Sequence, residues 1–206
     1  MITVLNGEYT GHSGGPDPKA VGQGGVSMED EQSYDKARRK ILWSIVNGLY
    51  LVGSRYEDDC NVMTCSFVTQ VATSPKLVGI GVETGSKSAE LIENGKAYSL
   101  MFLRRSQRDV VRKFVKPALC DREKRELNGY SYEDGPLTKV PVLKEALAFA
   151  ECSLYEKLHF ESHVFFIGEV LNVVSNAEEV PDGTPAADGR VLEVLRMEDT
   201  NMHYGG

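Results

Sequence analysis

The sequence predicts a small, mainly antiparallel β-barrel with a few flanking helices. Short runs rich in Val, Ile, Leu, Phe and Tyr recur along the 206 residues, and turn residues such as Gly, Pro and Asp separate them. Few helical segments interrupt these runs, so most successive strands lack the crossover helix that a doubly wound parallel sheet requires. An antiparallel barrel suits this order of elements better, because a closed sheet leaves few exposed edges.

The composition is that of a globular protein of about one domain. Hydrophobic residues make up 41% of the chain and charged residues 26%, which are ordinary values. The formal net charge of -7 argues against general nucleic-acid binding, because Lys and Arg supply most of that affinity. No apolar run reaches the ~20 residues that cross a bilayer, and the N-terminus lacks a secretory signal pattern. We therefore expect no nucleic-acid or membrane partner and a cytoplasmic location.

The N-terminal segment differs from the rest of the chain. Residues 1–28 are rich in Gly and show no hydrophobic period, which predicts a flexible arm before a domain at 29–206. Apolar residues then recur at helical spacing, which predicts a helix over 33–47 with Ser33 as its N-cap. Gly48 is expected to end this helix.

The remaining elements follow from apolar runs and their bounding residues. The runs with strand character cover residues 49–54, 60–67, 76–83, 97–103, 149–160, 163–174 and a short 190–195. Two helices are predicted between them, one at 86–93 capped by Ser86 and one at 106–116 ended by Pro117. Residues 118–147 are mostly polar, which predicts an irregular insertion at the surface.

The predicted strand at 60–67, with sequence CNVMTCSF, carries more small polar groups than packing requires. In one interpretation its hydroxyls lie on a half-exposed face while Met63, Cys65 and Phe67 fill the core. In the other, the strand binds an anion or a heterocycle. Asn61 both donates and accepts hydrogen bonds, hydroxyls donate to phosphate or carbonyl oxygens, and small side chains let a planar ring approach the backbone.

A second candidate site is the segment GSKSAEL at residues 85–91. Gly85 lets the chain turn, Ser86 and Ser88 offer hydroxyls, and Lys87 brings a compact positive charge. A helix begins here with unpaired N–H groups, an arrangement that binds phosphate. An ordinary serine cap with no ligand explains the same residues, because serine begins many helices.

Cysteine and histidine add one candidate group. The four cysteines, Cys60, Cys65, Cys120 and Cys152, contain no C-x-x-C pair, and we expect free thiols. Cys60 and Cys65 are five residues apart, so a strand places them on opposite faces. His163 opens a very apolar strand, where its ring can cover a ligand or transfer a proton near neutral pH. A structural histidine at the strand end is the alternative, and we expect neither a nucleophile nor a metal.

Three segments in order resemble the flavin reductase-like proteins of the FMN-binding split-barrel group. They are residues 61–83, 86–114 and 150–174, and the resemblance covers roughly residues 38–175 and the closing Tyr-Gly-Gly. It implies a six-stranded antiparallel split β-barrel of Greek-key topology. It also implies a homodimer in which residues from both copies complete each active site.

The resemblance also implies a set of site residues. In this family the polar strand and the following loop line the flavin, and the Ser/Lys-bearing helix start lies near the ribityl phosphate. The implied flavin-binding residues are Asn61, Val62, Met63, Thr64, Cys65, Ser66, Ser86, Lys87, Ser88 and Tyr204. His163 corresponds to the histidine of an Asp-His pair beside the nicotinamide or flavin ring. Family members often carry Gly-Asp-His where this chain has Glu161, Ser162 and His163.

The implied cofactor is FMN, with FAD as the alternative, and the implied electron donor is NAD(P)H. The corresponding activity is that of a flavin reductase-type oxidoreductase that passes electrons to a second acceptor. Two other functions suit the same resemblance. One is an FMN-containing electron carrier of the flavoredoxin type, reduced by a redox partner protein, and the other is a non-enzymatic flavin-binding module.

Overall fold

The computed structural model describes residues 28–175 and 194–200, in two compact units. Helix α1 (Met28–Leu42) belongs to the first unit, and the chain from Ile45 onward forms the second. The helix begins and ends earlier than predicted, and Ser33 lies inside it. Several polar residues precede Ser33, and any of them can begin a helix, so the sequence does not fix this boundary. The predicted arm lies outside the described residues except for Met28.

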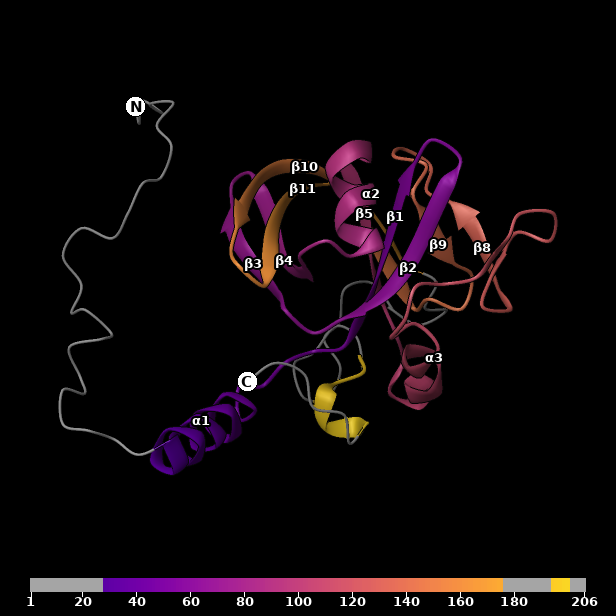
Figure 1. Ribbon diagram of the computed structural model, residues 1–206. Coiled ribbons are helices and arrows are strands. Elements are labelled where there is room, and N and C mark those ends of the chain that lie inside the picture. The colour runs from indigo at the N-terminus through magenta and orange to yellow at the C-terminus, as the bar shows by residue number, and fades with distance from the viewer. Residues whose placement is uncertain (1–27, 176–193, 201–206) are drawn as a thin grey trace, which may run out of the picture. The chain divides into compact units, whose positions relative to one another are not determined.

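The second unit contains a seven-stranded antiparallel sheet in the order β2-β1-β5-β10-β11-β4-β3 (Figure 1). Its strands are β1 (Tyr50–Tyr56), β2 (Asp59–Cys65), β3 (Val68–Thr73), β4 (Lys76–Glu83), β5 (Ala97–Phe102), β10 (Ala148–His159) and β11 (His163–Ser175). Only Ser66 and Phe67 separate the two edge strands β2 and β3, so the chain brings both sheet edges together at one end. The predicted antiparallel β fold is confirmed, with one strand more than expected.

The additional strand is β3. It pairs only with β4, and most of its residues are exposed, so it lacks the apolar pattern of a core strand. An irregularity between Gln70 and Ala72 also shifts its register. A bulge of this kind interrupts the alternation of side chains that identifies a strand in a sequence.

A second, four-stranded sheet occupies the segment that was predicted to be irregular. Its strands are β6 (Cys120–Asp121), β7 (Glu126–Leu127), β8 (Tyr130–Asp134) and β9 (Pro141–Leu143). The prediction was wrong because strands this short show no measurable period. Their inward residues, which include Leu127, Tyr132 and Leu143, are nevertheless buried.

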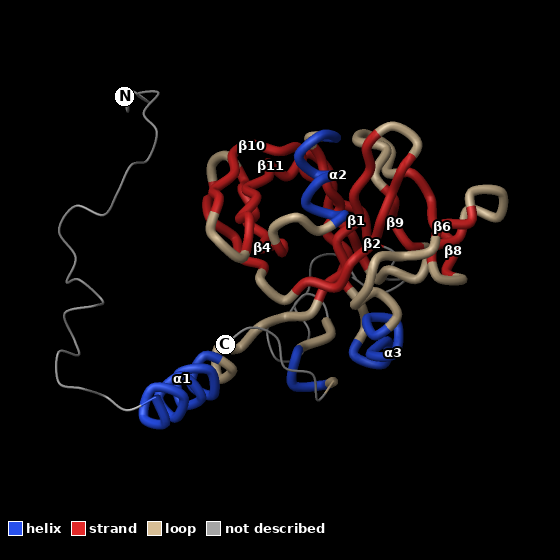
Figure 2. Tube along the Cα trace, in the orientation of Figure 1, coloured by secondary structure: helices blue, strands red, loops and turns tan. Residues whose placement is uncertain are grey.

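Helix α2 (Lys87–Gly95) lies against β1 and β2 (Figure 2). Its start is as predicted, because Ser86 Oγ accepts a hydrogen bond from the N–H of Ala89. It ends two residues later than predicted, at Gly95, and the following Lys96 adopts the left-handed conformation, with φ of 57°. A Cβ at Gly95 would collide with the carbonyl oxygen of Arg55 on β1. The glycine therefore allows close packing of helix on strand.

The predicted helix at 106–116 is shorter in the structure. A 3₁₀ turn, η1 (Arg105–Gln107), precedes α3 (Arg108–Arg112). The N–H groups of Lys113 and Phe114 bond to carbonyls three residues earlier, which tightens the helix end. Of the predicted strand at 190–195, the described residues form only an isolated bridge between Val194 and Arg104, followed by η2 (Met197–Asp199).

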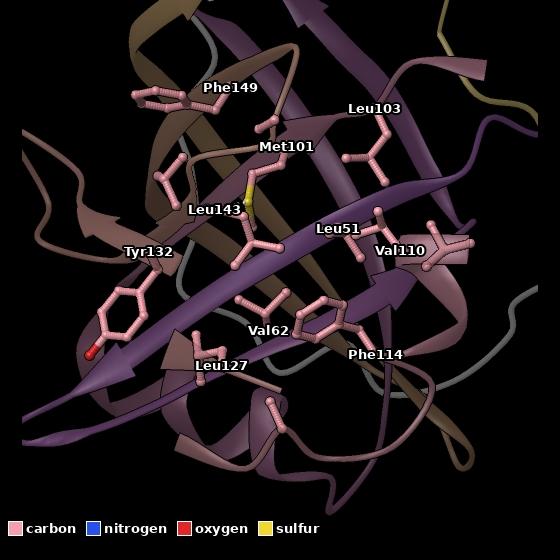
Figure 3. Close-up of a cluster of buried hydrophobic side chains, with 14 of the residues drawn as sticks. Leu51, Val62, Met101, Leu103, Val110, Phe114, Leu127, Tyr132, Leu143 and Phe149 are labelled. Carbon is pink, nitrogen blue, oxygen red and sulfur yellow. Dashed lines mark hydrogen bonds between the residues drawn. The ribbon is translucent and has the colours of Figure 1, made fainter. Parts of the chain in front are cut away.

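Two clusters of buried side chains fill the second unit. One contains side chains of the main sheet, α3 and the small sheet, such as Leu51, Val62, Phe114 and Leu143 (Figure 3). The other contains Cys65 and residues of α2, β4 and β11. Because side chains alternate along a strand, Val62 and Cys65 of β2 belong to different clusters. Strand β2 is thus covered on both faces although it lies at a sheet edge.

Candidate functional site

The polar groups at the start of β2 are bonded inside the protein. Asn61 is only 2% exposed. Its Nδ2 donates to Ser88 Oγ on α2 at 2.8 Å, and its Oδ1 accepts from the Ala118 N–H at 2.8 Å. A buried amide must be hydrogen-bonded to avoid a desolvation cost. These two bonds meet that requirement and join β2 to α2 and to the segment before β6.

The middle of β2 is fixed in the same way. Thr64 Oγ1 donates to the Val111 carbonyl at 2.6 Å, and the Thr64 N–H donates to the Phe114 carbonyl at 3.0 Å. Cys65 Sγ donates to the Gly81 carbonyl on β4 at 3.5 Å. Burial raises the pKa of Cys65 to about 12, so this thiol is neutral at physiological pH. Each polar group of the strand therefore reaches a different neighbouring element.

Several residues predicted to contact flavin also have partners inside the protein, and their contact with flavin stays a prediction. Asn61, Val62, Cys65 and Ser88 are all buried and contact protein on the described part of the chain. The reason is that both faces of β2 are covered, a feature that the strand's own sequence does not reveal. Met63 and Thr64 are half-buried.

Beyond Cys65 the chain leaves the sheet and its side chains acquire fewer partners. Ser66 is mostly buried, and its Oγ makes no hydrogen bond to the residues described here. Phe67, which one of the two interpretations of this strand placed in the core, is exposed, and its ring centroid lies 5.5 Å from that of His163. The Phe67 carbonyl accepts the Gly81 N–H at 2.8 Å, which holds this turn against β4.

The start of α2 carries a lysine whose side chain is partly exposed. Gly85 turns the chain with φ of 73° and has open space around it. Lys87 and Ser88 stand in the first helical turn, where backbone N–H groups have no intrahelical acceptor and the helix dipole favours anions. Lys87 Nζ lies 2.8 Å from Asp59 Oδ1, and these side chains are 30% and 55% exposed.

His163 begins β11 opposite Glu83 of β4. Its Nδ1 lies 3.0 Å from Ser162 Oγ, which leaves Nε2 without a partner in the described structure. The Ser162 carbonyl accepts the Thr84 N–H at 3.0 Å, so the turn between β10 and β11 is fastened to the junction between β4 and α2. This contact, which the sequence analysis missed, sets the place of His163.

Three segments that are distant in the sequence are therefore linked by contacts in the second unit. They are the end of β2, the junction of β4 with α2, and the turn between β10 and β11. We call this region the open edge and define it by Ser66, Phe67, Ser86, Lys87 and His163. Phe67 was not among the predicted site residues, although an aromatic residue beside a small polar one at a strand end was a usable signal. Tyr204 lies outside the described residues.

Within residues 28–175 and 194–200, no three His, Cys, Asp or Glu side chains gather as metal ligands. In the same part of the chain, no helix is both long and apolar enough to cross a membrane. The expectations about metal, membrane and cellular location stay predictions.

Comparison with known proteins identifies relatives that match most of the second unit. The family model described as "Flavin reductase like domain" matches residues 42–191. An uncharacterised protein of Pyrococcus abyssi is 28% identical over 137 residues, which cover 66% of this chain and 78% of that protein.

Two solved structures have the same fold. Flavoredoxin from Methanosarcina acetivorans gives a TM-score of 0.62 at 24% identity, covering 79% of this chain and 89% of that one. The NADH:FAD oxidoreductase of Streptomyces globisporus C-1027 gives 0.60 at 20% identity, covering 73% and 82%. At these identities the match concerns the fold.

Proposed function

The chain belongs to the flavin reductase-like domain family, and from this premise we propose that it binds FMN at the open edge. The groups present there fit such a ligand. The first turn of α2 offers backbone N–H groups and Lys87 offers an ammonium group, which together suit a phosphate. Ser66 supplies a hydroxyl that has no hydrogen-bond partner within residues 28–175 and 194–200, and Phe67 supplies an aromatic face. FAD carries the same phosphate and is the alternative cofactor.

The ion pair between Lys87 and Asp59 does not prevent this role. Both side chains are substantially exposed, and such a pair is worth about 0–1 kcal/mol. A charge-assisted hydrogen bond to phosphate is worth about 1.5–3 kcal/mol. Exchange of Asp59 for phosphate is therefore favourable, and Asp59 holds Lys87 near the helix start until then.

The buried residues of β2 support the site rather than line it. Asn61 fixes α2 to β2 through Ser88, and Thr64 fixes β2 to the end of α3. These bonds set the distance between the strand end and the helix start, which is the positioning that an enzyme of this kind requires.

The proposed activity is hydride transfer from NAD(P)H, with electrons passed on to a second acceptor. Bound FMN would supply the redox chemistry as hydride acceptor and electron carrier. His163 would orient the nicotinamide or exchange a proton through Nε2, because Ser162 occupies Nδ1. We also propose a homodimer in which each copy completes the other's site, with the N-terminal arm and Tyr204 as the exchanged elements.

The observation that carries this proposal is the set of contacts that links the end of β2 to His163 and the turn before it to the segment that begins α2, where Lys87 lies. Its test is titration of the purified full-length protein with FMN, followed by fluorescence quenching, and then anaerobic stopped-flow mixing with NADH and NADPH. We expect quenching and rapid bleaching of the flavin absorbance. A protein that leaves FMN fluorescence unchanged contradicts the proposal.

The variant His163→Ala separates two parts of the proposal. It should slow flavin reduction more than it weakens FMN binding, because the ring acts beside the reacting centre. An unchanged reduction rate would remove the role assigned to His163 and leave FMN binding standing.

One observation favours the electron carrier as a second candidate. Ser162 stands where family members often carry Asp, so the His163 ring is bonded to a neutral hydroxyl and not to a carboxylate. In this case a redox partner protein would reduce the flavin. If dithionite reduces the bound FMN but neither NADH nor NADPH bleaches it, the result would support the electron carrier. If no redox partner protein reduces the flavin either, the result would support the non-enzymatic flavin-binding module.

A further inference from the structure

Two cysteines outside the open edge lie in contact. The Sγ atoms of Cys60 on β2 and Cys120 on β6 are 3.6 Å apart, although 60 residues separate them in the sequence. Both are free thiols in the structure. The proposed flavin chemistry uses neither of them. Spacing along the chain gave no sign of this pair, because the small sheet that carries Cys120 was not predicted.

The backbone around the two thiols is held in place. Asn61 follows Cys60 directly, and its Oδ1 accepts the N–H of Ala118, two residues before Cys120. Strand β6 is in turn paired with β7 through Cys120 and Leu127. A disulfide needs a sulfur separation of about 2 Å. Rotation of the side chains can close most of the remaining gap while these bonds keep the two strands together.

A cation lies beside the pair. Arg55 is held by Asp134 at 2.9 Å, and its Nε is buried with no hydrogen-bond partner in the described residues. Burial and the hydrogen bond with Cys120 raise the pKa of Cys60 to about 11, while Arg55 and the Tyr132 hydroxyl act to lower it. Cys60 is therefore protonated at neutral pH, and Arg55 stabilises the negative charge that develops on its sulfur when it reacts.

The two sulfurs differ in access. Cys60 is 1% exposed, whereas Cys120 is half-buried and lies on the wall of an open cleft of about 680 Å³. The cleft lies between the end of α3 and the small sheet, and Lys113, Lys116 and Asn128 line it as well. A small oxidant reaches Cys120 first, and Cys60 is positioned behind it to react with the product.

We propose that Cys60 and Cys120 form a peroxide-responsive thiol pair that closes to an intramolecular disulfide. Hydrogen peroxide oxidises the Cys120 thiol to a sulfenic acid and releases one water molecule. The Cys60 sulfur then attacks the Cys120 sulfur, the S–O bond breaks, and the hydroxyl leaves with the Cys60 proton as a second water. Two thiols lose two electrons and two protons, and peroxide gains them. The new bond joins β2 to the small sheet beside Asn61.

The test is mild oxidation of the purified full-length protein with hydrogen peroxide, followed by alkylation and mass spectrometry. Trypsin cleaves after Arg55, Lys113 and Arg122, and cyanogen bromide cleaves after Met63, which separates Cys60 from Cys65. We expect loss of two alkylatable thiols and a cross-linked pair of peptides, 56–63 with 114–122. Persistence of both thiols, oxidation of Cys120 to sulfinic acid without a cross-link, or a cross-linked dimer would overturn the proposal.

Matched variants identify the sulfurs. Cys120→Ser should abolish the cross-link, and because Cys120 is half-buried this variant should fold, which circular dichroism verifies. Cys152→Ala removes a different buried thiol and should leave the cross-link intact. As an independent readout, oxidation should raise the thermal unfolding midpoint of the wild type, because the bond closes a long loop. It should not raise that of Cys120→Ser, and an equal rise in both would contradict the assignment.

Discussion

The two ends of β2 differ although both carry small polar side chains. At the start of the strand, Asn61 is bonded on both sides of its amide and is sealed from solvent. At the end, Ser66 has no protein partner in the described residues, and Phe67 and His163 lie beside it in the open edge. The difference arises from position: Asn61 lies between α2 and the segment before β6, whereas Ser66 lies beyond Cys65, the last residue of the strand.

This comparison shows that one residue pattern can serve two purposes. A buried polar group with complete hydrogen bonding stabilises the fold, whereas one without a partner is available to a ligand. We therefore expect that substituting a polar group with complete internal hydrogen bonding changes stability. Substituting one without a partner should change flavin binding.

Asn61→Ala should cause the largest loss of stability. It removes both hydrogen bonds and leaves Ser88 Oγ and the Ala118 N–H buried without partners, so the free energy of unfolding should fall by about 2–4 kcal/mol. Urea denaturation measures this change. Ser66→Ala, just after the same strand, is the matched control and should unfold at nearly the wild-type urea concentration. Equal losses in the two variants would remove the distinction between the strand ends.

Glu151 on β10 extends the comparison to a second internal polar group. Its carboxylate is 0% exposed and accepts hydrogen bonds from the Leu137 and Thr138 N–H groups, from Thr138 Oγ1 and from Asn172 Nδ2. Burial acts to raise the pKa of Glu151, but these hydrogen bonds outweigh it and hold the pKa below its ordinary value. The ionised form is thus the one that the fold prefers.

Glu151→Gln should lower the free energy of unfolding by about 1–3 kcal/mol at neutral pH, because an amide cannot accept all of these hydrogen bonds. The folded pKa is depressed, so the wild type has this stabilisation above the unfolded pKa of about 4.3 and loses it as pH falls through the lower folded value. Denaturation across this acid range should show the difference between the two proteins shrinking. A constant difference would contradict the linkage.

Lys87→Ala should weaken FMN binding by about 1–3 kcal/mol if the ammonium contacts the phosphate. Riboflavin lacks the phosphate, so its affinity should hardly change, and stability should change little because the ion pair with Asp59 is exposed. Fluorescence titration with both ligands measures the effect. Lys144→Ala removes another lysine that pairs with a carboxylate and should leave FMN binding unaltered. Equal weakening for FMN and riboflavin would place Lys87 away from the phosphate.

Ser66→Ala should have the smallest effect. Loss of one hydroxyl donor should weaken FMN binding by about 0.5–1.5 kcal/mol, while stability is maintained because that hydroxyl has no protein partner to lose. Isothermal titration calorimetry measures the FMN affinity, and urea denaturation of the same preparation measures the stability. A stability loss with unchanged FMN affinity would move Ser66 into the internal class with Asn61.

The sequence predicted the long elements of the second unit well. The strand at 76–83 coincides with β4, and α2 begins at the serine cap that was predicted. These elements have strong local signals, namely a continuous apolar run and a side chain that bonds a helix end. Strand β3 and the small sheet were missed because exposed or very short strands carry no such signal.

The candidate site was predicted less completely than the fold. Lys87 and the start of α2 were identified from local chemistry, and the Lys87 side chain is partly exposed. Asn61 was assigned to the ligand because its amide is versatile, but the structure uses that versatility for two internal bonds. The contact of Phe67 with His163 and the contact of Cys60 with Cys120 join distant parts of the chain, so no local pattern could indicate them.

By itself, then, the sequence determined an antiparallel β fold and a serine- and lysine-bearing helix start, since hydrophobic period and capping are properties of neighbouring residues. Which polar groups along β2 and just after it are enclosed depends on tertiary packing. Helices α2 and α3 and the small sheet pack against the strand but leave Ser66 and Phe67 beyond its end, and burial is a property of those combined surfaces rather than of the strand.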